Sequence, residues 1–171
     1  MLIQYVSDKH FQPSAGAIRS CACRGSHQLR VFMSYKCAKV AALIAGLQGR
    51  DWPARYLGFF DCFNRGLYYD AHDLLEGLWL PSRRESNDLF YKGLIQLAGA
   101  FVHFQKDRLR PAGALLRLAR NNLAVYPAIH EGIQVTAVIR LVDDWLSRLQ
   151  QRWGEENPFQ SCAPPKLEWP D

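Results

Sequence analysis

The sequence contains no run of about 18 consecutive apolar residues, so it offers no candidate for a transmembrane helix. It has five cysteines among 171 residues, and no two of them form a Cys-x-x-Cys pair. An odd number without that spacing argues against a disulfide framework and against a cysteine-rich zinc module. No glycine-rich phosphate-binding loop is present either. The cysteine pattern fits a reducing compartment, so we expect a cytoplasmic protein.

Residues 1–32 differ from the rest of the chain, because they lack sustained periodicity and carry +3 of the net charge of +5. No apolar core follows a basic start, which argues against a secretory signal. The acid-poor, arginine-bearing composition is typical of an organelle transit leader. We favour instead either a disordered extension or a non-native leader that precedes a true start at Met33. The remaining chain is nearly balanced in charge. The basic pI of the whole sequence therefore does not favour nucleic acid as a partner.

From residue 33 onward, hydrophobic periodicity predicts helices and no convincing strand. A short helix and a linker are expected at 33–54, a helical bundle domain at 55–151, and a proline-rich, extended or disordered tail at 152–171. Within the bundle domain, helices are predicted at 55–64, 68–79, 87–105, 111–124 and 133–151. The short connections favour antiparallel neighbours. The predicted fold is therefore all-α, a single-domain antiparallel bundle of five to six helices.

The helix predicted at 87–105 is apolar nearly all round, which is typical of the central helix of a bundle. Gly93 and Gly99 each cost about 1 kcal/mol of helix propensity relative to alanine. We expect them where a neighbouring helix approaches closely. Gln96 and His103 lie two turns apart on one stripe of this helix, and buried polar groups need partners.

Reactive side chains gather on the helix predicted at 68–79. His72 and Glu76 are four residues apart, so they share one face and supply one nitrogen and one oxygen ligand. His103 is the favoured third ligand for a divalent metal ion, and Asp73 and His130 are weaker candidates. Tyr68, Trp79 and Gln96 are expected to support this pocket, Gln96 as a partner that fixes the tautomer of a histidine ring.

Two other interpretations of the same residues stay open. His72 and Glu76 could instead hydrogen-bond to each other, or to Tyr68 and Gln96, and lock the helix packing. His72 could also act as a general acid or base oriented by a carboxylate, without a metal.

A weaker candidate site consists of basic residues near the turn at 106–110. Arg108, Arg110, Arg117 and Arg120 form a possible anion patch beside Lys106. A solvated helix face is the simpler explanation of these charges. No helix-turn-helix spacing, Cys/His finger or aromatic RNA-binding motif accompanies them.

One ordered motif carries a family resemblance. It reads Phe63-Asn64-x-Gly66-x-Tyr68-Tyr69-Asp70-Ala71-His72-x-x-x-Glu76-x-x-Trp79, then Gly93-Leu94-Ile95-Gln96-x-Ala98 and His103. Over about residues 55–127 the chain resembles the family called domain of unknown function number 309, small all-helical proteins of bacteria, archaea and plastid-bearing lineages.

The resemblance implies a His-x-x-x-Glu-x-x-Trp signature that has been suggested to bind a metal, with no activity attached to it. In this chain the signature falls on His72, Glu76 and Trp79, with Gln96 and His103 on the following helix. The chain departs from the family in two places. Asp70 and Asp73 stand where members often have glutamate, and Gly77 replaces a longer residue, which predicts a looser helix after Glu76.

The sequence therefore supports two functions of different classes. The first is a divalent-metal-binding pocket, with metal-dependent hydrolase-like chemistry if the protein is an enzyme. The second is a non-catalytic interaction or scaffold protein, in which the same residues form a buried network. The sequence does not identify a partner, and a homo-oligomer stays open.

Overall fold

The computed structural model describes residues 38–151 and 156–171, and the predicted leader at 1–32 lies outside them. The unit from Val40 to Asp171 is compact in its own right. Its elements are η1 (Ala45–Leu47), α2 (Ala54–Asn64), α3 (Tyr68–Trp79), η2 (Leu80–Ser82), α4 (Asp88–Gln105), α5 (Leu109–Leu123), β1 (Ile129–His130), β2 (Ile133–Gln134), α6 (Val135–Gln151) and α7 (Pro158–Ser161). This architecture confirms the predicted helical bundle. Among the described helices, none combines the length and the apolar character that a membrane crossing requires.

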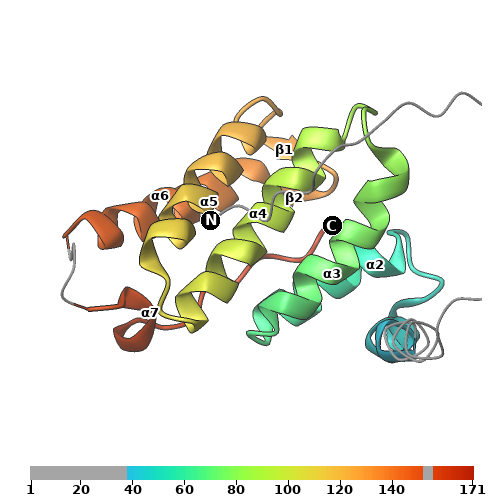
Figure 1. The fold of residues 1–171 in the computed structure, drawn as a ribbon. Coiled ribbons are helices and arrows are strands. Elements are labelled where there is room, and N and C mark those ends of the chain that lie inside the picture. Colours follow the sequence, from blue (N-terminus) through green and yellow to red (C-terminus); the bar gives the residue numbers. More distant parts are fainter. Residues whose placement is uncertain (1–37, 152–155) are drawn as a thin grey trace, which may run out of the picture. The chain divides into compact units, whose positions relative to one another are not determined.

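The long helices pack mainly on their neighbours in sequence: α2 on α3, α3 on α4, α4 on α5, and α5 on α6. Three residues connect α2 to α3 and α4 to α5, so the chain reverses direction between packed helices. Figure 1 shows α4 between α3 and α5. As the sequence predicts, α4 is the central helix, and it buries side chains along its whole length.

Phe101 of α4 lies at the centre of an aromatic core. Its ring contacts Phe63 of α2, Tyr68 of α3, Trp145 of α6 and Phe159 of α7, with ring centroids 5.0–6.2 Å apart. Because one side chain joins four other helices, this cluster fixes the end of α3 that precedes the candidate site.

Gly93 marks a close approach of α4 to α5. A Cβ atom at this position would lie 2.8 Å from Leu123 Cγ and 3.3 Å from the Ala119 carbonyl oxygen. At Gly99 a Cβ atom would lie 3.3 Å from Leu115 Cδ1. The two glycines that cost helix propensity thus lie where α5 packs against α4, as expected from the sequence.

The helix prediction at 133–151 is wrong at its first two residues, because α6 begins at Val135. Ile133 and Gln134 instead pair with Ile129 and His130 in an antiparallel ribbon. The turn residues Glu131 and Gly132 have φ values of 47° and 71°, as a two-residue hairpin turn of type I′ requires. Strands of two residues are too short to produce a readable alternation of apolar and polar positions.

The C-terminal residues 156–171 pack against the bundle, although the sequence suggested an extended or disordered tail. Asn157 is buried, and its Nδ2 donates to the Phe104 carbonyl at 2.7 Å. Further along, Leu167 is buried and its backbone pairs with the side chain of Asn64. In Figure 1 this segment runs from α7 across the bundle toward α2 and α3.

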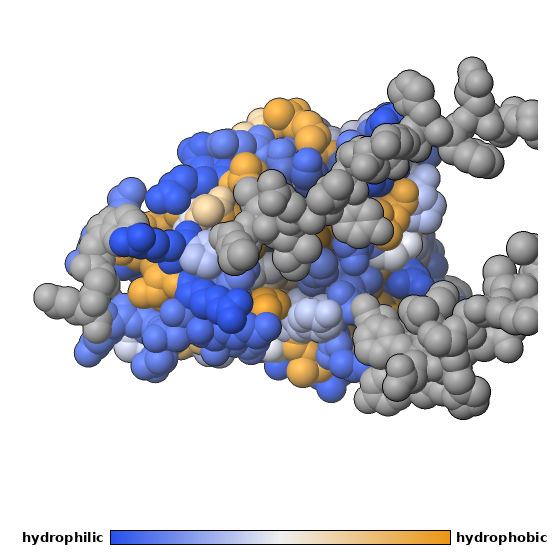
Figure 2. Space-filling view, viewed as in Figure 1, coloured by the Kyte–Doolittle hydropathy of each residue, from blue (hydrophilic) through white to orange (hydrophobic). Residues whose placement is uncertain are grey.

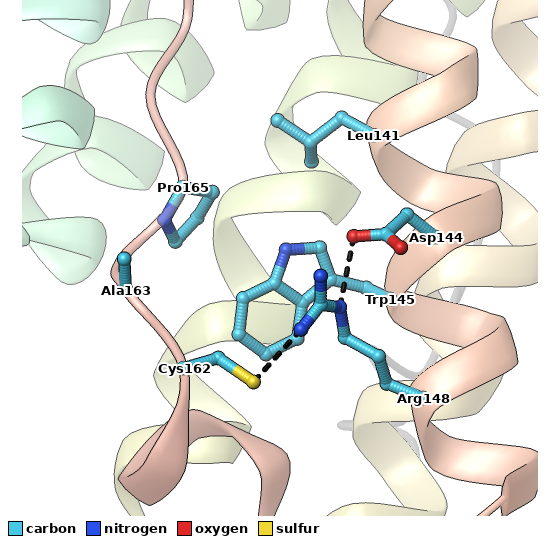
Figure 3. A pocket seen from close by; sticks show the side chains of 7 residues that line it. All are labelled: Leu141, Asp144, Trp145, Arg148, Cys162, Ala163 and Pro165. Atoms are coloured by element: carbon cyan, nitrogen blue, oxygen red, sulfur yellow. Dashed lines mark hydrogen bonds and ion pairs between the residues drawn. The ribbon is translucent and has the colours of Figure 1, made fainter.

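A hollow of about 330 Å³ lies between α6 and the C-terminal segment. Figure 3 shows the Arg148 guanidinium between Asp144 and Cys162 at this hollow. Arg148 donates to Asp144 Oδ2 at 2.8 Å and to Cys162 Sγ at 2.9 Å. The pKa of Arg148 is raised by these two partners, Asp144 first. Through these two hydrogen bonds, the guanidinium joins α6 to the C-terminal segment.

Candidate metal centre

The helix α3 carries the predicted site, and its limits coincide with the predicted range. Gly66 precedes it with a φ of 75°, a conformation that glycine adopts at low cost, so the chain can turn sharply from α2 into α3. Asp70 lies in the first turn, where a carboxylate interacts favourably with the helix dipole. Pro81 follows within η2 and prevents the α-helix from continuing.

Three side chains of α3 converge near the middle of the helix. His72, Asp73 and Glu76 each offer a ligand atom, and these atoms lie within 4.8 Å of one another. All three side chains are half-buried. No second group of three or more histidine, cysteine or acidic side chains that could hold one ion occurs among the described residues. The structure thus brings Asp73, rather than His103, to the predicted pair.

The His72 ring lies between Asp73 and the surface of α4. Its Nδ1 atom is 3.5 Å from Asp73 Oδ1, which is an ion-pair distance but not a hydrogen bond. Its Cδ2 atom lies 3.9 Å from the position that a Gly99 Cβ would occupy. The ring therefore packs beside Gly99 on α4, at a distance that a methyl group would fill as an ordinary van der Waals contact.

Three buried side-chain polar atoms in the described part of the chain have no hydrogen-bond partner: Tyr68 OH, His72 Nδ1 and His103 Nδ1. Tyr68 lies one turn before His72 on α3, and His103 lies one turn after Gly99 on α4. Buried polar groups are normally paired, so three unpaired atoms on adjoining turns of two packed helices mark this region as a candidate polar site. All three belong to residues that the sequence assigned to the pocket.

The same burial shifts the pKa values of Tyr68 and His103. Burial raises the pKa of the Tyr68 phenol to about 12, so this group stays protonated at neutral pH. The pKa of His103 is lowered, first by burial and then by the nearby charges of Arg108 and Lys106. His103 therefore favours the neutral imidazole, which is the form that binds a metal or accepts a proton.

A comparison with protein families finds a match over this part of the chain. Residues 56–115 match the model of a family described as "Domain of unknown function (DUF309)". This segment belongs to the DUF309 family. It extends from the first turn of α2 into α5 and contains the three side chains of the candidate centre and His103. No curated protein and no solved structure matches the chain.

Two residues of the DUF309 segment that were predicted to support the pocket have partners elsewhere. Gln96 Oε1 accepts a hydrogen bond of 2.8 Å from Asn122 Nδ2, which links α4 to α5. Trp79 Nε1 donates to Asp88 Oδ1 at 2.5 Å and closes the turn between α3 and α4. Both side chains therefore hold the helices in place.

The remaining predicted site residues lie outside the group of three. His130 is in the β-ribbon, where its Nε2 atom is 2.8 Å from Asn87 Oδ1. In the candidate anion patch, Arg120 pairs with Asp143 at 2.6 Å. The side chains of Arg108, Arg110 and Arg117 are exposed. None of these five residues belongs to the group of three on α3.

Arg55, at the start of α2, is a neighbour of the centre that the sequence analysis did not identify. A Cβ atom at Gly77 would collide with Arg55 Nη1 and would lie 3.1 Å from Arg55 Cζ. The guanidinium thus lies against the bare backbone of α3, directly after Glu76. The DUF309 helix continues unbroken to Trp79, so Gly77 leaves space for Arg55 without ending α3. The only feature of the sequence that pointed to this contact is the glycine in the middle of the predicted helix.

Proposed function

We propose that the DUF309 segment of this chain binds a divalent metal ion through His72, Asp73 and Glu76. One observation carries the proposal: an imidazole and two carboxylates offer ligand atoms within 4.8 Å of one another, while His72 Nδ1 has no hydrogen-bond partner. A bound ion gives these side chains a common partner.

The spacing and chemistry of the group fit such an ion. Zinc–ligand bonds to nitrogen and oxygen are about 2.0–2.2 Å long, so two ligand atoms of one ion lie no more than about 4.4 Å apart. A group within 4.8 Å needs at most a small side-chain rotation to reach that spacing. Imidazole nitrogen with carboxylate oxygen suits zinc, iron or manganese.

Three protein ligands would leave coordination positions open to water or a substrate. A divalent ion in that setting supplies a polarised, more acidic water, which suits hydrolysis of a phosphate ester or an amide. The chain's own contribution is to orient the His72 ring between Asp73 and α4. His103, kept neutral one turn from Gly99, could take up a proton near this position.

The alternative function is a non-catalytic interaction protein in which the polar residues form a structural network. The bonds from Gln96 to Asn122 and from Trp79 to Asp88 support that interpretation for those residues. It does not account for His72, because a network residue has hydrogen-bond partners and the His72 Nδ1 atom has none. The metal-binding function therefore explains more of the site.

Elemental analysis of protein purified without chelator or affinity-tag nickel tests the proposal. We expect wild-type protein to contain or take up nearly one zinc, manganese or iron ion per chain, and we expect His72→Ala to lose it while staying folded. The matched control is Gln96→Ala, which breaks the hydrogen bond to Asn122. It should keep the metal and lose about 1–3 kcal/mol of the free energy of unfolding.

Wild-type protein that contains none of these metals, and that does not take them up on titration, would exclude the metal site. A His72→Ala variant that binds metal normally but unfolds more easily would instead support the structural network.

A further inference from the structure

Arg55 is a cation without a partner beside the proposed metal centre. Its side chain is half-buried, and it forms no hydrogen bond or ion pair in the part of the chain that the structure describes. Removing a charge from water costs free energy unless the charge is paired. The guanidinium is thus held in a place where it lacks the carboxylate or phosphate that arginine normally binds.

Helix geometry places this guanidinium on the face of α3 that carries Asp73, and Glu76 lies about 100° further round the helix. Arg55 lies against Gly77, which follows Glu76 directly and stands one turn after Asp73. Because Gly77 has no side chain, nothing separates the guanidinium from the helix backbone. Any residue larger than glycine would displace it, since Arg55 Cζ lies only 3.1 Å from the position of a Cβ atom.

We infer that Arg55 and the proposed metal ion together bind a phosphoryl group of the substrate. This inference rests on the proposed function, because Asp73 and Glu76 must be occupied by the ion. A divalent ion with these two carboxylates is neutral, and Arg55 adds one positive charge, so the assembled site attracts an anion.

The number of oxygens decides between a phosphoryl group and a carboxylate. Arginine binds oxyanions through two parallel N–H···O bonds, which uses two oxygens of the ligand. Contact with the ion requires a third. A phosphate monoester has three non-bridging oxygens and satisfies both contacts at once, whereas a carboxylate has only two. The substrate class is therefore a phosphate monoester or a similar phosphorylated compound.

The test uses the full chain loaded with Mn²⁺ and inorganic phosphate as the probe. Bound Mn²⁺ accelerates the ³¹P relaxation of a phosphate held at the ion, and the electron paramagnetic resonance spectrum of Mn²⁺ measures metal affinity separately. We expect saturable ³¹P relaxation enhancement in the wild type. In Arg55→Gln, phosphate affinity should fall about tenfold or more while Mn²⁺ affinity is unchanged.

The matched control is Arg65→Gln, at the other end of α2, because Arg65 is exposed and already paired with Asp61 at 2.9 Å. This variant should bind phosphate like the wild type. Gly77→Ala provides a second route, since it displaces Arg55 without removing its charge, and it should also weaken phosphate binding. Circular dichroism verifies that each variant is folded.

Four outcomes would overturn the inference. If the wild type binds Mn²⁺ without phosphate, or if Arg55→Gln and Arg65→Gln bind phosphate equally well, the inference fails and the metal site stands. If Arg55→Gln binds Mn²⁺ more tightly with unchanged phosphate affinity, Arg55 is only a counter-ion of the carboxylates. If the wild type binds no Mn²⁺, the inference fails together with the proposed manganese site.

Discussion

Tyr56 and Tyr68 are both buried, but only one of their hydroxyl groups has a hydrogen-bond partner. Tyr56 OH donates to the Glu131 carbonyl at 2.8 Å, whereas Tyr68 OH has no partner. We expect Tyr68→Phe to raise the free energy of unfolding by about 1 kcal/mol, because it removes an unpaired buried hydroxyl. Tyr56→Phe should lower it by about the same amount. Urea denaturation of metal-free protein measures both changes.

The pH dependence of Tyr68→Phe gives an independent check. The pKa of Tyr68 is about 12 in the folded protein, above the value of about 10 in unfolded chains. Its contribution to stability is therefore fully present below pH 10 and is lost as the pH rises toward 12. Tyr68→Phe should be less sensitive to alkali than the wild type in this window. Equal sensitivity, with no gain in stability at pH 7, would mean that the hydroxyl has a partner in solution.

At the scale of single residues, spacing along one helix was more informative than contacts between helices. The four-residue interval of His72 and Glu76 was readable because helix geometry fixes which side chains share a face. The inclusion of Asp73 depends on side-chain rotamers, which spacing does not determine. The approach of Arg55 to Gly77 depends on how α2 packs on α3, and that packing has no local pattern in the sequence.

At the scale of helices, Gly93 sets how closely α4 and α5 approach. Gly93→Ala adds about 1 kcal/mol of helix propensity but places a Cβ atom 2.8 Å from Leu123 Cγ. Overpacking a well-packed core costs about 1–3 kcal/mol, so we expect a net loss of stability. Gly99→Ala is the matched control, because its nearest contact, Leu115 Cδ1, is the end of a flexible side chain 3.3 Å away. Thermal unfolding should show a lower midpoint for Gly93→Ala than for Gly99→Ala.

If both alanine variants gained stability equally, the two helices would be free to separate at Gly93, and the glycine would have no packing role. The comparison matters for the candidate centre, because Gly99 also borders the His72 ring at 3.9 Å. A methyl group there would be in ordinary van der Waals contact with the ring, so Gly99→Ala should leave metal binding unchanged with little effect on the fold.

Helices were predictable as elements because each repeats an apolar face over several turns, and α3 was predicted from Tyr68 to Trp79, as observed. The β-ribbon was not predictable, since two residues per strand give no period. The sequence made α4 the predicted central helix because apolar residues lie nearly all round it. The same property places it at the centre of the structure, where neighbouring helices cover most of its surface.

At the scale of the whole molecule, segments far apart in sequence close the bundle. Phe159 joins the aromatic core from the C-terminal segment, and Trp52 Nε1 donates to the Asp171 carbonyl across most of the described chain. Figure 2 shows a largely hydrophilic face with small, separate hydrophobic patches. Proline content suggested an extended or disordered tail, but composition does not reveal a hydrogen-bond partner about a hundred residues away in the sequence.

Asn64, at the end of α2, is the anchor for this closure. Its Nδ2 donates to the Leu167 carbonyl at 2.8 Å, its Oδ1 accepts from the Leu167 N–H at 2.7 Å, and its own carbonyl accepts from Lys166 Nζ. Because Asn64→Ala removes both side-chain bonds to the backbone of the buried Leu167, we expect the free energy of unfolding to fall by about 1–3 kcal/mol. Asn121→Ala, at an exposed position of α5, should change it by less than about 0.5 kcal/mol.

Hydrogen exchange should show faster exchange at Leu167 in Asn64→Ala but not in Asn121→Ala. Unchanged protection of Leu167 in Asn64→Ala would mean that other contacts, such as the buried Asn157 and Phe159, hold the segment without Asn64.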